Sequence, residues 1–101
     1  MLITLDEPGR EVLLMGNEAI ARGAIEAGVA FCSAYPGTPS SEILGVLAEA
    51  APKLGFYAEW STNEIVAMEA AAAASFSGLR ALCAMKSQGL SVCADFLTTL
   101  N

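Results

Sequence analysis

The 101-residue sequence predicts an α/β domain of three layers, in which helices cover both faces of a parallel sheet. Short apolar runs alternate along the chain with longer segments whose apolar residues recur at helical spacing. Polar loops containing Pro, Gly and Ser separate them, and such alternation favours parallel strands joined by right-handed crossovers. The expected elements are helices over residues 17–27, 40–50, 63–77 and from about 91 onward, and strands over 29–35, 56–60 and 80–85.

The first eleven residues are expected to form an arm or a short strand, and residues 12–101 the domain itself. Polarity alternates only loosely over the first segment, and a Pro-Gly pair interrupts it. At the other end, the chain stops within an apolar, helix-like run that has no cap. We therefore expect residues 12–101 to be part of a domain that is truncated at its C-terminus.

Capping residues and helix breakers set the expected helix boundaries. Asn17 is a favourable N-cap for the first helix, and Gly28 supplies its stop. Thr38 followed by Pro39 is typical of an N-cap with proline at the first position of the second helix. Pro52 is expected to end that helix, because its ring clashes with the preceding turn.

The third helix carries the strongest helical signal in the sequence. An alanine run over residues 70–74 has high helix propensity and leaves a slim face that a neighbouring element can approach closely. Ser61 and Glu64 have the spacing of a capping box at its start, and Gly78 follows its end. The strands are short and mostly apolar, as expected for a sheet that is covered on both faces.

Composition excludes several function classes. The net charge is −6, and the five basic residues are scattered, which argues against a nucleic-acid-binding face. Histidine is absent, so Ser-His and Cys-His catalysis and His-bearing metal sites are excluded. No uncharged apolar run reaches the roughly 18 residues that a membrane span needs. We therefore expect this chain to bind no nucleic acid, membrane or metal ion of its own.

The three cysteines are expected to be buried free thiols. Cys32, Cys83 and Cys93 each lie among apolar residues, and no two of them form a Cys-x-x-Cys motif. The N-terminus carries acidic residues and lacks the basic-then-apolar pattern of a secretory signal. Free thiols without a signal sequence favour the reducing cytoplasm as the compartment.

Three loops follow the expected strands, over residues 35–41, 60–64 and 86–90. Because the carboxyl ends of parallel strands meet at one edge of a sheet, where open α/β sheets bind ligands, these loops are expected to lie together. Each loop also has a purely structural explanation, as a helix cap in the first two and as a polar turn in the third. From the residues alone, both explanations stay open.

The functional explanation gives each loop a chemical role. Thr38, with the backbone of Pro36 and Gly37, would present a hydroxyl and amides to a small anionic ligand. Glu64 would be a carboxylate available as a hydrogen-bond acceptor or as a general acid–base group. Gly89 would allow a ligand to approach the backbone closely.

Taken together, these segments resemble a known family of enzymes. The resemblance rests on Gly-Asn-Glu-Ala at 16–19, Tyr-Pro-Gly-Thr-Pro-Ser-Ser-Glu at 35–42, Glu-Trp-Ser-Thr-Asn-Glu at 59–64 and Met-Lys-Ser-Gln-Gly-Leu at 85–90. They are similar to the N-terminal, pyrimidine-binding domain of 2-oxoacid:ferredoxin oxidoreductases, most of all to the alpha subunit of the indolepyruvate branch. The resemblance covers nearly all of the chain from Val12 onward. Gly37 and Met85-Lys86 are similar to the indolepyruvate branch, whereas Ser87-Gln88 is similar to the pyruvate branch.

The resemblance implies a thiamine diphosphate enzyme in which this chain holds the aminopyrimidine ring of the cofactor. In the family, a glutamate at the Glu64 position bonds N1′ of that ring. This bond favours the imino form of the 4′-amino group, which then removes the C2 proton. The resemblance thus implies a catalytic and cofactor-binding role for Glu64 and a substrate-binding role for Thr38. It implies cofactor-binding roles for four further residues: Pro36, Gly37, Gln88 and Gly89.

By the same resemblance, the whole enzyme decarboxylates indolepyruvate or another aryl pyruvate to an acyl-CoA and passes electrons through iron–sulfur clusters to ferredoxin. Other domains of the subunit supply magnesium, its ligands and the clusters. A beta subunit, ferredoxin and coenzyme A are the expected partners of a cytoplasmic oligomer. This chain is then a fragment that is inactive alone. Two alternatives stay open: a thiamine-dependent non-oxidative 2-oxoacid decarboxylase subunit, and a non-catalytic scaffold domain of the same fold.

Overall fold

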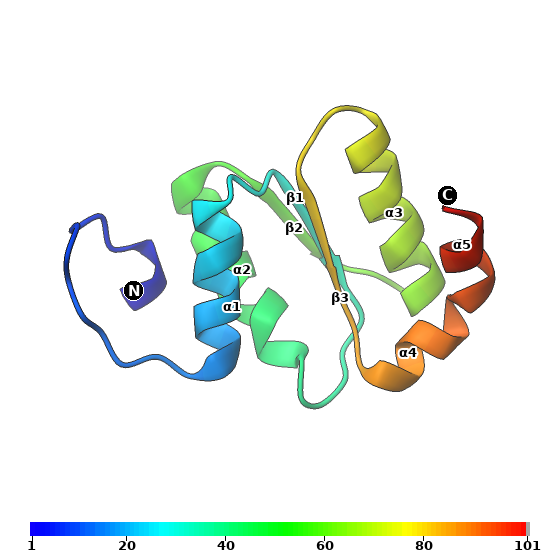
Figure 1. Ribbon diagram of the computed structural model, residues 1–101, viewed down its shortest axis with the longest axis horizontal. Helices are drawn as coiled ribbons and strands as arrows, with labels where there is room; N and C mark the ends of the chain where they lie inside the picture. Colours follow the sequence, from blue (N-terminus) through cyan, green and yellow to red (C-terminus); the bar gives the residue numbers. More distant parts are fainter. Residues whose placement is uncertain (101) are drawn as a thin grey trace.

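Three parallel strands form the central sheet of the computed structural model, which describes residues 1–100. The strands lie in the order β2-β1-β3, with β1 (Phe31–Ala34) between β2 (Tyr57–Trp60) and β3 (Ala81–Ala84). Helices α1 and α2 cover one face of the sheet, and α3, α4 and α5 lie on the other (Figure 1). Their bounds are Gly16–Glu26, Ser41–Leu54, Glu64–Phe76, Ser87–Val92 and Ala94–Thr99. The predicted three-layer α/β class with a parallel sheet is confirmed.

The strand register aligns the residues that were expected on neighbouring parallel strands. Phe31 pairs with Tyr57 on one side and with Ala81 on the other, and Cys32 pairs with Leu82. The rings of Phe31 and Tyr57 stack across the strands, with 5.4 Å between their centroids. All three strands begin one or two residues later than their apolar runs, and β1 and β3 also end one residue earlier.

Side chains from η1, α1, α2 and the sheet form the main hydrophobic core. Leu44 and Leu47 on α2 are fully buried, and so is Cys32 on β1. The buried residues of α2 recur at helical spacing, as expected for a helix that packs one face against a sheet. The core therefore fixes α2, and with it the loop that precedes this helix, against the sheet.

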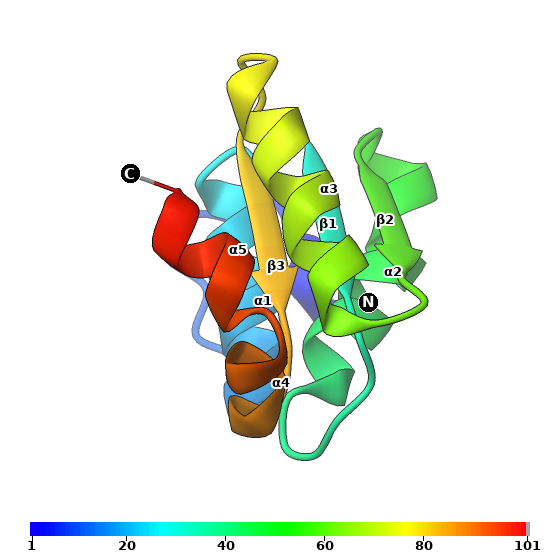
Figure 2. The same ribbon diagram turned by 90° about the vertical axis from the view of Figure 1, so that its right-hand side faces the viewer.

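The opposite face of the sheet is covered by the alanine-rich helix α3, as Figure 2 shows. Ala67 and Ala71 are buried on it, and the buried Ser33 hydroxyl donates a hydrogen bond of 2.6 Å to the Ala67 carbonyl. Small side chains let the helix approach the strands this closely, and the hydrogen bond satisfies a polar group that would be costly to bury alone. Both features position the first turn of α3 at the end of the sheet.

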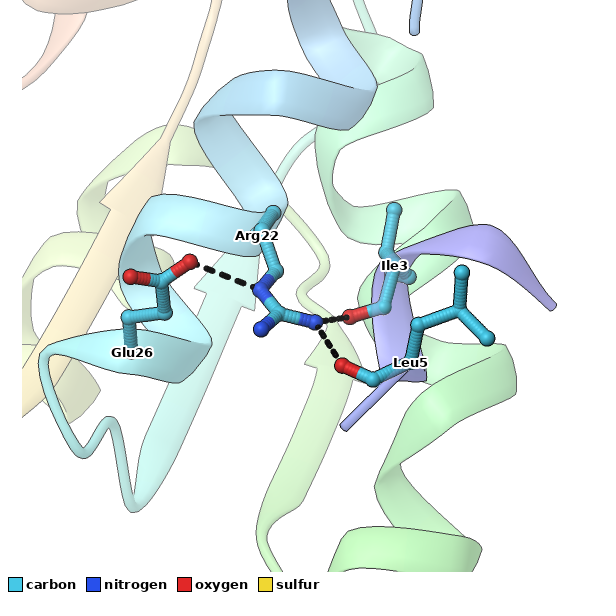
Figure 3. A network of polar contacts seen from close by, with 4 residues as sticks. All are labelled: Ile3, Leu5, Arg22 and Glu26. Atoms are coloured by element: carbon cyan, nitrogen blue, oxygen red, sulfur yellow. Dashed lines mark hydrogen bonds and ion pairs between the residues drawn. The ribbon is translucent and has the colours of Figure 1, made fainter. Parts of the chain in front are cut away.

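The N-terminal segment packs against the domain instead of forming a strand. Leu2–Thr4 is a short 3-10 helix (η1), and its Ile3 side chain is 1% exposed within the core. The Arg22 guanidinium donates hydrogen bonds of 3.1 Å and 2.6 Å to the carbonyl oxygens of Ile3 and Leu5. It also pairs with the Glu26 carboxylate at 2.8 Å (Figure 3). The strand alternative for this segment is therefore wrong, because one apolar side chain and one arginine hold it as a turn against α1.

Several expected helix boundaries are corrected. Helix α1 begins at Gly16, one residue before the expected cap, and the Glu18 carboxylate accepts a 2.9 Å hydrogen bond from the Met15 amide. Asn17 is therefore free to bond elsewhere. Pro52 lies inside the last turn of α2, which continues to Leu54. A proline restricts the turn before it, not the residues after it, so the helix ends only at Gly55, whose φ is +80°.

The segment after β3 folds earlier than expected. The sequence predicted a loop around Gly89 and a helix from about residue 91, but α4 already begins at Ser87 and contains Gly89. Cys93 separates it from α5. A single glycine costs a helix about 1 kcal/mol, which tertiary contacts readily outweigh. Across residues 1–100, no helix has both the length and the apolar character that crossing a bilayer requires.

Candidate active site

The carboxyl ends of the three strands bring the three predicted loops to one edge of the domain. Residues 35–40 join β1 to α2, residues 61–63 join β2 to α3, and residues 85–86 join β3 to α4. The first loop and α4 lie together at the lower edge in Figure 1. The beginning of α3 lies beside them in the view of Figure 2. Ligands of open α/β sheets bind at this edge.

Glu64 is the first residue of α3, and its carboxylate takes no part in capping that helix. The cap is Asn63, whose side-chain Oδ1 accepts a 2.9 Å hydrogen bond from the Val66 amide. The capping box of Ser61 and Glu64 is therefore wrong, because Asn63, not Ser61, begins the helix. Ser61 instead donates a 3.3 Å hydrogen bond to the Glu59 carboxylate. Glu64 makes no hydrogen bond or ion pair within residues 1–100, so its carboxylate is available to a ligand.

Gly89 packs its backbone directly against the Glu64 side chain. A Cβ atom built on Gly89 would lie 2.7 Å from Cγ, 3.2 Å from Cδ and 3.0 Å from Oε2 of Glu64. Real Cβ atoms essentially never approach other atoms within 3.0 Å. Gly89 is buried, and its φ is not positive, so the position requires glycine for space and not for backbone conformation. Two of the predicted site residues, distant in sequence, thus meet.

The first loop is shaped by residues on either side of it. The Gly37 amide donates to the Ser41 hydroxyl at 2.8 Å, and the Ser40 amide and hydroxyl donate to the Gly37 carbonyl at 2.8 Å and 3.1 Å. Asn17 donates a 2.6 Å hydrogen bond from α1 to the Pro39 carbonyl. These bonds tie the loop to α1 and to the start of α2.

Thr38 is not the cap of α2. The helix begins at Ser41 with Ser40 in the cap position, and Thr38 and Pro39 lie in the turn before it. No side chain caps this helix, and the hydroxyls of Ser40 and Ser41 bond Gly37 in the loop instead. Pro36 and Thr38 are exposed, and the Thr38 hydroxyl makes no hydrogen bond within residues 1–100. The structural explanation of Thr38 is thus removed, which leaves its hydroxyl free for a ligand.

A second close approach joins the first loop to the third. A Cβ atom built on Gly37 would lie 2.7 Å from Cβ of Lys86 and 3.6 Å from its Cγ and Cδ. The aliphatic stem of Lys86 therefore lies over Gly37. The sequence associated both residues with one branch of the family, and the structure shows that they touch. The sequence did not single out Lys86 as a site residue, because no motif or spacing indicated this contact.

The remaining predicted residues are less closely tied to this arrangement. Gln88 is exposed, and its side-chain oxygen accepts a 3.1 Å hydrogen bond from the neighbouring Ser87 hydroxyl. No hydrogen bond joins Thr38, in the first loop, to Glu64, at the start of α3, within residues 1–100. Among the described residues, no three carboxylate or thiol groups are close enough together to hold a metal ion.

The three cysteines lie on β1, on β3 and between α4 and α5, outside the three connecting loops. Cys32 and Cys93 are buried free thiols as predicted, whereas Cys83 is only partly buried. Burial raises the pKa of the Cys32 thiol and of the Cys83 thiol to about 11. Thiols with such pKa values are largely protonated near neutral pH and are poor nucleophiles. The groups that remain available to a ligand at this edge are therefore the carboxylate, hydroxyl and ammonium groups of its side chains.

Comparison with known proteins identifies relatives over nearly the whole chain. Subunit IorA of indolepyruvate oxidoreductase from Thermococcus kodakarensis is 57% identical over 101 residues, which are 99% of this chain and 16% of the relative. IorA from Archaeoglobus fulgidus is 53% identical over 97 residues, or 92% of this chain and 16% of the relative. Subunit KorA of 2-oxoglutarate synthase from Methanocaldococcus jannaschii is 42% identical over 79 residues, or 78% of this chain and 22% of the relative. The chain thus spans about one sixth of the length of the IorA relatives.

A solved structure supports the same relationship. The 2-oxoglutarate:ferredoxin oxidoreductase from Magnetococcus marinus, with 2-oxoglutarate, coenzyme A and succinyl-CoA bound, aligns with a TM-score of 0.76 and 32% sequence identity. The alignment covers 80% of this chain and 14% of that one. The model of the pyruvate flavodoxin/ferredoxin oxidoreductase thiamine diphosphate-binding domain matches residues 22–99. The chain therefore belongs to the family of thiamine diphosphate-binding domains of pyruvate flavodoxin/ferredoxin oxidoreductases.

Proposed function

We propose that the loop edge binds the aminopyrimidine ring of thiamine diphosphate in a 2-oxoacid:ferredoxin oxidoreductase, with the Glu64 carboxyl at N1′ of the ring. The family and the names of the relatives support the cofactor and the reaction class. We further propose indolepyruvate or another aryl pyruvate as the substrate, because the IorA relatives share more than half of their aligned residues with this chain. The product is then an acyl-CoA, and ferredoxin accepts the electrons.

One observation carries this proposal, namely that the Glu64 carboxylate is held in place without a partner. A carboxylate at the start of a helix usually completes a cap, but Asn63 performs that task here. The backbone of α4 at Gly89 confines the side chain from one side. A confined carboxyl that has no internal hydrogen bond fits a ring nitrogen with which it can share a proton.

The fit extends to the neighbouring loops. Pro36 and Gly37 would place their backbone beside the ring, and Gln88 and Gly89 would form a second wall. Thr38 would direct its free hydroxyl to the substrate. When bound, thiamine diphosphate supplies the electron sink that decarboxylation of a 2-oxoacid requires. The residues of this chain bind and orient the ring, and Glu64 holds the proton at N1′.

The other parts of the enzyme are proposed to lie outside these 101 residues. They include magnesium and its ligands, the iron–sulfur clusters, the remaining domains of the subunit and a beta subunit. Coenzyme A and ferredoxin would bind the assembled oligomer. We propose the cytoplasm as the compartment, where the three free thiols would remain reduced. Residues 12–101 are proposed to form the pyrimidine-binding part, with the packed N-terminal segment as its extension.

The proposal is tested by Glu64→Gln in the assembled holoenzyme. Glutamine keeps the size and a hydrogen-bonding group but cannot share a proton with N1′. Hydrogen–deuterium exchange at C2 of the bound cofactor should slow by roughly 10²–10⁴-fold, the usual contribution of a positioned acid–base group. Cofactor affinity should change little. Glu69→Gln, on the same helix and exposed, is the matched control and should leave the exchange rate unchanged.

The same experiment separates the alternatives. Equal exchange rates in Glu64→Gln and in the parent enzyme would contradict the catalytic role of Glu64. Exchange no faster than that of the free cofactor, even in the parent, would favour a non-catalytic scaffold. Turnover to an aldehyde without ferredoxin or coenzyme A would favour a non-oxidative decarboxylase.

A further inference from the structure

We propose that Lys86 is a substrate-binding residue, whose ammonium group binds the carboxylate of the 2-oxoacid substrate. This inference rests on the proposed function and names a group that the sequence did not assign to the site. It follows from where the lysine is held, from the state of its charge and from the chemistry of decarboxylation.

The first step is the position of the lysine. Lys86 follows the last strand and lies at the same edge as Glu64 and Thr38. Its stem, from Cβ to Cδ, packs on Gly37, the residue directly before Thr38. Because the stem is held against backbone, the ammonium group is carried by a short and restricted remainder of the side chain. The exposed lysine therefore carries its ammonium group on a stem that lies against the loop that we assign to the substrate.

The second step is the charge. Four of the five basic side chains have a partner within residues 1–100. The partners are the Glu7 carboxylate for Arg10, the Glu26 carboxylate for Arg22, the Thr4 hydroxyl for Lys53 and the Ala27 carbonyl for Arg80. Lys86 is the one basic residue of this described part without an ion pair or hydrogen bond. A chain with a net charge of −6 thus keeps, at the loop edge, the one basic side chain of residues 1–100 that has no partner.

The third step is the identity of the anion. A carboxylate beside Thr38 can accept one hydrogen bond from the hydroxyl and a charge-assisted one from the ammonium group. Both donors would then act on the same substrate group. The cofactor diphosphate and the phosphates of coenzyme A are the other anions of the reaction, and the test distinguishes them.

The fourth step is the expected kinetic signature. In decarboxylation the bond between the carboxyl carbon and C2 of the substrate breaks. Its electron pair stays on C2, and neutral CO2 leaves. A cation at the carboxylate stabilises the charged ground state and loses its partner as CO2 forms, so it contributes to binding and not to bond breaking. Loss of the lysine should therefore raise KM without lowering kcat.

The test is Lys86→Met in the holoenzyme, with Lys53→Met as the matched control on the far side of the domain. Methionine keeps an apolar stem on Gly37 and removes the charge. We expect KM for indolepyruvate or phenylpyruvate to rise about 10- to 100-fold, the range for loss of one charge-assisted contact. Lys86→Arg, which keeps the charge, should recover most of the affinity. KM of the parent enzyme should rise with salt concentration, because salt screens the attraction between the exposed ammonium group and the substrate carboxylate. This measurement needs no variant.

Three results would overturn the inference. They are an unchanged KM for the 2-oxoacid in Lys86→Met, a weakened affinity for thiamine diphosphate, and a raised KM for coenzyme A alone. The last two would assign the cation to a phosphate. Absence of 2-oxoacid turnover in the parent enzyme would instead contradict the proposed function, so the two failures are distinguishable.

Discussion

A methyl group added at position 89 should impair the proposed chemistry of this domain without unfolding it. Gly89 lies within α4, is buried, and has no positive φ. Alanine is therefore compatible with its backbone, and in a helix it is favoured over glycine by about 1 kcal/mol. The three atoms nearest to the added Cβ all belong to the Glu64 side chain.

The size of the effect follows from the geometry of this contact. The Cβ of Gly89→Ala would lie 2.7 Å from Cγ of Glu64, whereas ordinary van der Waals contact begins at 3.4 Å. The Glu64 side chain must therefore move by about 0.7 Å, or by more if its carboxyl changes rotamer. A misplacement of about 1 Å in a catalytic group can cost about 10²-fold in rate. We expect kcat to fall about 10- to 100-fold.

The assay combines kcat of the holoenzyme with its thermal unfolding. Overpacking at Gly89 opposes the gain in helix propensity, so the two effects on stability partly cancel. The matched control is Gly23→Ala, an exposed helical glycine on α1 around which nothing lies within 4 Å. It should raise stability slightly and leave kcat unchanged. Full activity in Gly89→Ala would refute the view that this glycine positions the Glu64 carboxyl.

Two further predictions concern the fold beneath the site. Asn63→Ala should lower the free energy of unfolding by about 1 kcal/mol because it removes the cap of α3, and Ser61→Ala should lower it less. Chemical denaturation of both variants measures these changes. A larger loss in Ser61→Ala would instead support a capping box of Ser61 and Glu64. The thiols of Cys32 and Cys83 both have pKa values of about 11. Because Cys32 is fully buried, only Cys83 of these two should react with iodoacetamide in the native state, about tenfold faster for each pH unit from 8 to 10. Their folded-state pKa values exceed the ordinary 9.0, so their contribution to stability is complete below pH 9 and is lost between pH 9 and 11. A denaturation midpoint that rises over this interval would contradict this pKa assignment.

The sequence predicts the layers and the edge of this domain because both depend on local patterns. Apolar runs such as 29–35 place strands, and strictly alternating elements place every loop after a strand on the same side. Caps were predicted less well, since several polar residues compete for each helix start. Asn63 lies between Ser61 and Glu64, and only the position of the helix relative to the sheet decides which of them begins it.

The sequence did not indicate which of its distant segments contact each other at this edge. Nothing in residue spacing indicates that Gly37 supports Lys86 or that Gly89 confines Glu64, because each pair joins segments that are distant in the chain. Glycines in loops are usually explained by backbone conformation. Here the reason is the space that another loop occupies, and that reason exists only after the sheet has brought the loops together.

The contact between Gly37 and Lys86 has a consequence for how such domains can diverge. Any residue with a Cβ atom at position 86 would meet a Cβ at position 37 at the distance found here, so the two positions cannot change independently while the loops keep their paths. In a relative with a bulky residue at position 37, the segment around position 86 must follow a different path. The side chain at position 86 would then reach a different place relative to the substrate. Residues 37 and 86 are therefore expected to covary among relatives. An attempt to graft the first loop from a relative with a different substrate would need the third loop from the same source.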